Sequence, residues 1–329
     1  MAPEKRKRKM MIPKKLNIAH LPTPLEKIRF RNHEFLIKRD DYTGSDFLGN
    51  KIRKLEYLLH EAKKLKSDII FTCGGDQSNH ARATASVSAK LGLKTRLFLW
   101  GDEKKIADGN LFLDKMFGSE IVYLSKNEFS KVDDIMTAER TKMVKKGKRV
   151  YVIPAGGSST LGIWGYISFM NELKKQSDLK NIEGIFSACG SGGTAAGLLV
   201  GAALNKVRLK IFAVNVLLPK QIIEKKILQL AEGAVVDYNL KCKIDKNNLE
   251  IIDGYSKEGY KNISDHKIEL ITEFARTTGI LLDPAYTGKA FCAFDEIILE
   301  NGKGKRVVFL HTGGIFGTFP KRNKFLQFT

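Results

Sequence analysis

The 329-residue sequence has only four cysteines and eight prolines. Cys73, Cys189, Cys242 and Cys292 are too far apart to form a C-x-x-C pair, which argues against a zinc knuckle or a dithiol redox motif. Scattered single cysteines are typical of a reducing compartment, so we expect a cytoplasmic location. No proline-rich linker divides the chain.

Long apolar runs are also missing. No stretch approaches the roughly 18 apolar residues that a membrane span needs. The basic start "MAPEKRKRKMMIPKKL" lacks the apolar run that follows the charged end of a secretory signal. We therefore expect no association with a membrane.

Acidic residues are few, with 36 Asp and Glu against 56 Lys and Arg, and the net charge is +20. Seven basic residues and one Glu lie in residues 1–16, which we interpret as a flexible basic arm. This charge keeps a nucleic-acid-binding protein open as an alternative function. No DNA- or RNA-binding motif supports that alternative.

Short β-branched and aromatic runs alternate with helical patterns along the rest of the chain. The runs begin near residues 34, 68, 94, 120, 149, 182, 209 and 305, and helical patterns include 78–91, 129–146 and 161–173. This alternation predicts an α/β protein with mostly parallel sheets flanked by helices.

Glycine-rich segments follow several of the predicted strands, at residues 73–81, 154–162, 189–197 and 311–317. Ligands of open α/β sheets bind beyond the carboxyl ends of the strands. Each segment alone could be an ordinary tight turn. Together they predict one shared pocket.

The segment "CGSGGTAAG" stands between a predicted strand and a predicted helix. Its backbone N–H groups and the helix N-terminus would form a cradle for an anion, most naturally a phosphate. The residues of this cradle are Gly190, Ser191, Gly192, Gly193 and Thr194. A dinucleotide site is the rival, but the acid expected roughly 20 residues later is missing.

The segment "GNKIRKLEYLL" predicts a helix that begins near Lys51. A lysine in the first turn faces the positive end of the helix dipole. It is either a solvated surface residue or an amine kept partly neutral, to act as a nucleophile or base. A phosphate-bearing cofactor that forms an imine with lysine would explain both Lys51 and the glycine-rich cradle.

Five motifs carry a resemblance that runs from about Leu21 to Gly314: "GNKIRKLEYLL", "GGDQSNHARATASVSAKLGLK", "GSGGTAAG", "LLDPAYTGKA" and "FLHTGG". They resemble the D-cysteine desulfhydrase and 1-aminocyclopropane-1-carboxylate (ACC) deaminase family, enzymes that use pyridoxal 5′-phosphate (PLP). The resemblance implies the two-domain PLP fold type II and a homodimer. It implies a large domain of residues 17–54 and 161–329 and a small domain of residues 55–160.

The resemblance also implies cofactor contacts. Lys51 would bind PLP covalently and move the substrate Cα proton. Asn79 would hydrogen-bond the 3′ oxygen of the pyridine ring, and residues 190–194 would bind the phosphate. Asn50 and Lys54 are expected beside the cofactor, with a surface ion pair as the alternative for Lys54. Thr287 and Thr312 are expected near the ring nitrogen, and Thr287 could instead only cap a helix.

The substrate contacts implied by the resemblance lie on two segments. Gln77, Ser78 and Asn79 would bind the substrate carboxylate at a helix start, where Ser78 could also be a plain N-cap. Tyr286 would face the substrate. Tyr260 is a weaker match to a second family tyrosine that faces the substrate, because the proline that usually follows this motif is absent. The alternative is that Tyr260 is a packed core residue. No residues stand at metal-ligand spacing, so we predict no metal site.

The predicted reaction is α,β-elimination on D-cysteine, which gives pyruvate, sulfide and ammonia. The deaminases tend to carry a Glu where this chain has Thr287, and a carboxylate there would keep the ring nitrogen protonated. ACC deaminase, or another PLP-dependent amino-acid lyase, is the alternative. Leu48 stands where the family usually has a glycine. A leucine there would narrow the entrance beside Lys51 or pack under it, so it bears on which substrate fits and not on the cofactor.

Overall fold

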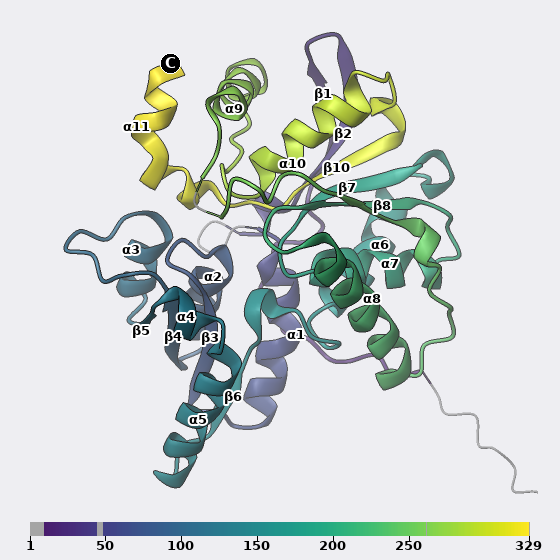
Figure 1. Cartoon of the computed structure of the whole chain (residues 1–329). Helices are drawn as coiled ribbons and strands as arrows, with labels where there is room; N and C mark the ends of the chain where they lie inside the picture. The colour runs from purple at the N-terminus through teal and green to yellow at the C-terminus, as the bar shows by residue number, and fades with distance from the viewer. Residues whose placement is uncertain (1–9, 45–48, 261, 329) are drawn as a thin grey trace, which may run out of the picture.

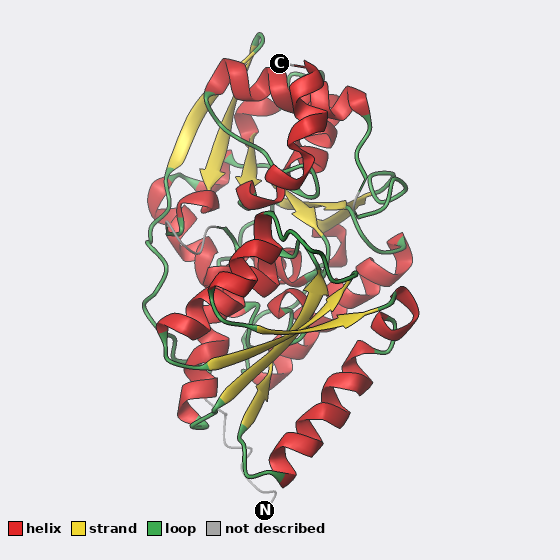
Figure 2. Ribbon diagram, turned by 90° about the vertical axis from the view of Figure 1, so that its left-hand side faces the viewer, coloured by secondary structure: helices red, strands yellow, loops and turns green. Residues whose placement is uncertain are grey.

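The computed structural model describes residues 10–44, 49–260 and 262–328, and within them the chain forms two β-sheets (Figures 1 and 2). The larger sheet has the order β1 (Leu25–Phe30), β2 (His33–Arg39), β10 (Val307–His311), β7 (Gly184–Cys189), β8 (Lys210–Asn215) and β9 (Leu249–Ile252). The smaller has the order β5 (Glu120–Leu124), β4 (Lys94–Trp100), β3 (Ile69–Gly75) and β6 (Val150–Val152). Leu48 lies outside the described residues.

Helices connect the strands and cover the sheets. They are α1 (Lys51–Lys64), α2 (Asn79–Lys90), α3 (Gly109–Met116), α4 (Lys126–Phe129), α5 (Val132–Lys145), α6 (Trp164–Gln176), α7 (Gly193–Leu204), α8 (Lys220–Asp237), α9 (Asp265–Thr278), α10 (Thr287–Phe294) and α11 (Arg322–Phe325). Among the described helices, none combines the length and the hydrophobicity that a membrane span requires.

Every strand pair of both sheets is parallel except β1 with β2, which form an antiparallel pair at one edge. The predicted α/β architecture is therefore present, and each predicted strand has a counterpart. Strands β1 and β9 were not predicted from the sequence. β1 is a partly exposed edge strand with charged residues between its apolar ones, and β9 has only four residues.

The larger sheet is covered on both faces. Helices α6, α7 and α8 pack on one face, and α9 and α10 pack on the other, as Figure 1 shows. All six residues of β7 are buried, which explains why this strand reads as a continuous apolar run.

Helix α7 is buried almost all round, and two glycines let it pack closely against α6. A Cβ on Gly197 would lie 2.6 Å from the Cβ of Tyr166, and one on Gly201 would lie 2.5 Å from Cγ of Met170. This close packing fixes the N-terminus of α7 beyond the carboxyl end of β7.

The smaller sheet is covered by α5 on one face and by α1, α2 and α3 on the other. Its strands span residues 69–152, inside the predicted small domain of residues 55–160. The domain boundaries themselves stay a prediction.

Helix α1 is tied to the larger sheet by buried ionic contacts. The guanidinium of Arg53 donates to Asp40 at 2.8 and 2.7 Å and to Glu172 at 2.8 and 2.9 Å. Tyr166 donates to Asp40 at 2.5 Å, and Lys38 donates to Glu172 at 2.6 Å. These contacts fix the helix two residues after Lys51.

The predicted basic arm of residues 1–16 is docked over its described part, residues 10–16. Leu16 donates its backbone N–H to the carbonyl of Glu56 at 3.0 Å, and Lys15 pairs with the buried Glu56 carboxylate at 2.5 Å. Residues 15 and 16 therefore contact α1 directly, because the buried Glu56 carboxylate needs a cation. Residues 1–9 lie outside the described part.

Candidate active site

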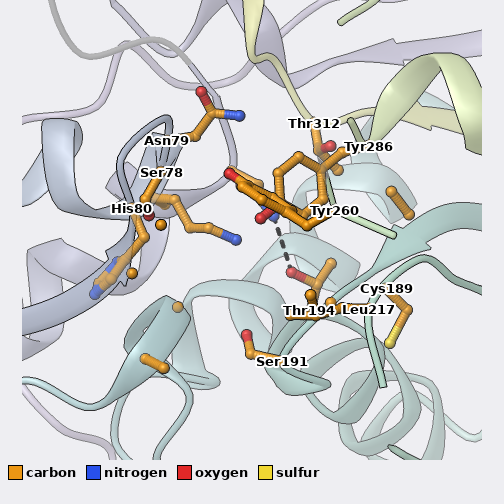
Figure 3. Close-up of a pocket in the computed structure, with 18 of the residues that line it drawn as sticks. Ser78, Asn79, His80, Cys189, Ser191, Thr194, Leu217, Tyr260, Tyr286 and Thr312 are labelled. Carbon is orange, nitrogen blue, oxygen red and sulfur yellow. Dashed lines mark hydrogen bonds between the residues drawn. The ribbon is translucent and has the colours of Figure 1, made fainter. Parts of the chain in front are cut away.

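A cavity of about 130 Å³ lies where the carboxyl ends of β3, β7 and β10 meet the start of α1 (Figure 3). A single water needs roughly 10–15 Å³ by the same kind of measure, so the space suits a small molecule. It is lined by Asn50, Lys51, Cys73, Gly74, Gly75, Ser78, Asn79, His80, Trp100, Phe129, Ala155, Gly156, Ala188, Cys189, Gly190, Ser191, Gly192, Thr194, Leu217, Tyr260, Tyr286 and Thr312. All four glycine-rich segments approach it, as the sequence predicts.

Lys51 is the first residue of α1, and its side chain lines the cavity. Protein atoms crowd the amine, and this burial lowers the pKa of Lys51 to about 8. Weaker influences from Cys189 and Asp283 act in the opposite direction. At pH 7 roughly a tenth of the amine is therefore neutral, far more than for a lysine of ordinary pKa near 10.4, and this neutral form can act as a nucleophile or base.

Lys54 lies one turn further along α1 and is 1% exposed. Its Nζ donates to the carbonyl of Gly156 at 3.3 Å. Burial lowers the pKa of Lys54 well below its ordinary value, and the neighbouring charge of Lys51 adds to the shift. Among the described residues no carboxylate forms an ion pair with Lys54, so the site lacks a negative charge that would compensate this amine.

The N-terminus of α7 meets Lys54 at Gly193. A Cβ on Gly193 would lie 2.9 Å from Nζ of Lys54 and would collide with the hydroxyl of Ser158. Ser158 also accepts a hydrogen bond from the backbone N–H of Gly193 at 3.2 Å and lies 2.8 Å from the hydroxyl of Ser191. A glycine cradle, two hydroxyls and a buried amine at a helix N-terminus fit a phosphate group.

Asn50 connects this cradle to the start of α1. Its Nδ2 donates to the Thr194 hydroxyl at 3.1 Å, a bond drawn in Figure 3. Its backbone N–H donates to the carbonyl of Thr312 at 3.1 Å. These bonds hold α1, α7 and the end of β10 together around Lys51.

The start of α2 forms another wall. Ser78 is the N-cap, and its hydroxyl accepts from the backbone N–H of Ala81 at 3.2 Å while it lines the cavity. Both roles weighed for Ser78 are thus geometrically compatible. Gln77 is turned away: its Nε2 donates to the carbonyl of Asp108, and its Oε1 accepts from the backbone of Asn110, both at 3.0 Å.

Two tyrosines close the cavity opposite the phosphate cradle (Figure 3). The rings of Tyr260 and Tyr286 meet edge to face with centroids 5.7 Å apart. The Tyr260 hydroxyl donates to the carbonyl of Gln77 at 3.0 Å. Burial raises the pKa of Tyr286 to about 12 and raises that of Tyr260 as well, so both phenols stay protonated.

Thr312 lines the cavity, but Thr287 does not. The Thr287 hydroxyl donates to Asp283 at 2.6 Å and accepts from the Asp283 backbone at 2.8 Å. The carboxylate of Asp283, and not the Thr287 hydroxyl, accepts the backbone N–H groups at the start of α10. Thr287 therefore supports this carboxylate and makes no capping hydrogen bond of its own. The hydroxyl that reaches the cavity is that of Thr312, at the end of β10.

Sequence reasoning missed lining residues that carry no motif, among them Trp100, Phe129 and Leu217. It also missed Ser158, which lies beside the phosphate cradle in a glycine-rich segment that the sequence did mark. His80 lines the cavity and contacts the Thr72 hydroxyl at 2.8 Å. Within residues 10–44, 49–260 and 262–328 no cluster of His, Cys, Asp and Glu could hold a metal ion.

Comparison with known proteins places these features in a family. A family profile described as "Pyridoxal-phosphate dependent enzyme" matches residues 16–313. The chain is 40% identical to a putative ACC deaminase of Thermotoga maritima, over 94% of this chain and 99% of that protein. It is 36% identical to the bifunctional D-cysteine desulfhydrase/ACC deaminase of Arabidopsis thaliana, over 93% and 79%.

Solved structures are similar too. A crystal structure described as an ACC deaminase homologue superposes with a TM-score of 0.86 at 34% identity, covering 96% of this chain and 97% of that one. O-ureido-L-serine synthase has a TM-score of 0.64 at 13% identity, with 90% of each chain covered, and so shares the fold.

Proposed function

Because this chain belongs to the family of pyridoxal-phosphate dependent enzymes that includes ACC deaminases and D-cysteine desulfhydrases, we propose that it catalyses α,β-elimination on D-cysteine. The products would be pyruvate, sulfide and ammonia. Membership confirms the predicted family, the PLP cofactor and the type II fold. A homodimer and a cytoplasmic location stay predictions.

The residues in and beside the cavity fit PLP. Lys51 would hold it covalently, the N-terminus of α7 with Lys54 and Ser158 would hold its phosphate, and Asn79 and Thr312 would bind its ring. When bound, PLP supplies an electron sink for the bond broken at Cα. The chain's own part is to orient the substrate and to move protons.

Three groups have suitable positions for the substrate. At the α2 N-terminus, Asn79 would offer its backbone N–H and Ser78 its hydroxyl proton to the substrate carboxylate. The Lys51 amine, with its lowered pKa, would take the proton from Cα. The protonated hydroxyl of Tyr286 would give a proton to the departing sulfur.

One observation carries the choice of elimination over ring opening. Among the described residues, no Asp or Glu lines the cavity, and the group offered from the end of β10 is the neutral Thr312 hydroxyl. The nearby Asp283 carboxylate is occupied by three backbone N–H groups and Thr287 at the start of α10. A neutral partner supports a weaker electron sink, which suffices when a good leaving group such as a thiol stands on Cβ.

The test is a side-by-side assay of D-cysteine, L-cysteine and ACC with the PLP-saturated enzyme, measuring keto-acid and ammonia release. We expect D-cysteine to give the highest kcat/KM. Faster ammonia release from ACC would overturn the proposal in favour of the deaminase alternative. A preference for L-cysteine would show that the substrate carboxylate and side chain exchange places.

A further inference from the structure

Asn110, a fully buried residue on α3, is outside the cavity but contacts Asn79 in its wall. Its Nδ2 donates to Oδ1 of Asn79 at 3.0 Å and to the backbone carbonyl of Gln77 at 3.0 Å. Its Oδ1 accepts from Nε of the buried Arg82 at 3.2 Å. Every polar atom of its side chain therefore has a partner.

The neighbours of Asn110 leave one possible orientation for its amide. A guanidinium only donates hydrogen bonds, so the atom facing Arg82 must be the amide oxygen. A backbone carbonyl only accepts, so the atom facing Gln77 must be the nitrogen. Rotating the amide by half a turn would place two donors together at Arg82 and two acceptors together at Gln77.

This fixed orientation determines that of Asn79. Because Asn110 presents a nitrogen, Asn79 must present its oxygen to it. The other end of the Asn79 amide, a nitrogen with two protons, is then the group left for the cavity. In Figure 3 this nitrogen lies on the side of Tyr260, Tyr286 and Thr312.

We propose that Asn110 is a positioning residue that makes Asn79 a hydrogen-bond donor toward the cofactor. Hydrogen bonds connect Arg82 to Asn110 and Asn110 to Asn79. They determine which end of the Asn79 amide faces the cavity, and not only where the side chain lies. A donor suits the 3′ oxygen of PLP, which is an acceptor when it carries negative charge. The inference uses the Asn79–cofactor contact assumed in the proposed function, but it is independent of the substrate.

The decisive variant is N110D, which keeps size and keeps an acceptor for Arg82 but loses the donor for Asn79. The new carboxylate would draw the Asn79 nitrogen toward itself and turn the Asn79 oxygen into the cavity. We expect PLP affinity to fall by at least about tenfold. It should fall further than in N110A, where no side chain at position 110 determines the orientation of the Asn79 amide. The visible absorbance of bound PLP should shift to shorter wavelength, as its 3′ oxygen becomes protonated.

A double-mutant cycle separates this polarity from mere packing. In an N79A background, N110D should change the PLP dissociation constant less than about twofold. If N110D proves unable to fold, the cycle is measured with N110A and N79A. The proposal then requires that their effects on PLP affinity are not additive. The control is R322A, which removes the contact of Arg322 with Asp108, the N-cap of α3, without touching Asn110. PLP affinity should not change in R322A.

The proposal would be overturned if N110D lost no more PLP affinity than N110A. It would also be overturned if the effects of the Asn110 and Asn79 substitutions on PLP affinity were additive. PLP titration needs no substrate. An inactive enzyme toward D-cysteine with an intact cycle would therefore refute only the proposed reaction.

Discussion

Replacing Lys54 by Met should have opposite effects on the protein with and without PLP. The variant K54M keeps most of the side-chain volume and removes the charge. In the cofactor-free protein it removes a buried amine that has no carboxylate partner among the described residues. In the PLP complex it removes the cation that we place against the phosphate.

The structure gives the expected magnitudes. Losing one partner of a buried charge pair costs about 2–5 kcal/mol, so the PLP dissociation constant should rise roughly 30-fold to 4,000-fold. Without PLP, removing a poorly satisfied buried polar group should raise the free energy of unfolding by about 1–3 kcal/mol.

The pH dependence provides a further check. The pKa of Lys54 is lower in the folded than in the unfolded protein, so the unfolded chain binds more protons and stability rises with pH. Stability rises over the pH range between the lowered pKa of Lys54 in the folded protein and its pKa of about 10.4 in the unfolded chain. K54M should lose this part of the slope and keep the part due to Lys51.

The assays are PLP titration and urea denaturation of the cofactor-free protein across pH. K64M is the matched control, because Lys64 is an exposed lysine on the same helix. A K54M protein that binds PLP like the wild type would refute the assignment of Lys54 to the phosphate. A loss of stability without PLP would refute the claim that the amine is unfavourable there.

Other predictions follow from the same geometry. Borohydride reduction and peptide mapping should find the pyridoxyl group on Lys51 and not on Lys54, and label elsewhere would contradict the assignment. Covalent attachment of PLP should accelerate as pH rises through about 8, since the neutral Lys51 amine is the nucleophile, and a flat profile by stopped-flow absorbance would be unexpected. D40N should lower the free energy of unfolding by about 3–5 kcal/mol in urea, because Arg53 loses a buried partner, and a loss below 1 kcal/mol would contradict this. Deleting residues 1–9 should leave turnover unchanged and weaken only salt-sensitive binding to polyanions, so a large fall in turnover would assign those residues a role at the site.

The sequence predicted best where the chemistry lies within one contiguous segment. Lys51 follows a helix start, and the cradle of residues 190–194 lies between a strand and a helix, so local pattern is enough to identify both. Ser78 could be predicted as an N-cap for the same reason. These segments meet in one cavity because parallel strands end at the same edge of a sheet.

The sequence predicted least where a side chain is directed by residues distant in the chain. Gln77 directly precedes two lining residues, yet Asp108 and Asn110 turn its amide toward α3. Thr287 follows Tyr286 directly, yet Asp283 holds its hydroxyl away from the cavity. Neither contact leaves a periodic pattern, since each depends on how two segments pack.

The two lysines of α1 show how local and tertiary effects combine at the site. Lys51 and Lys54 share one face of the helix because they stand three residues apart. The helix is held by Arg53, whose own charge is satisfied by Asp40 and Glu172. The fold thus pairs the Arg53 cation with carboxylates. Among the described residues, it leaves the amines of Lys51 and Lys54 at the cavity without a carboxylate ion pair. An anionic cofactor completes this arrangement, so we expect PLP binding to be coupled to the stability of the fold.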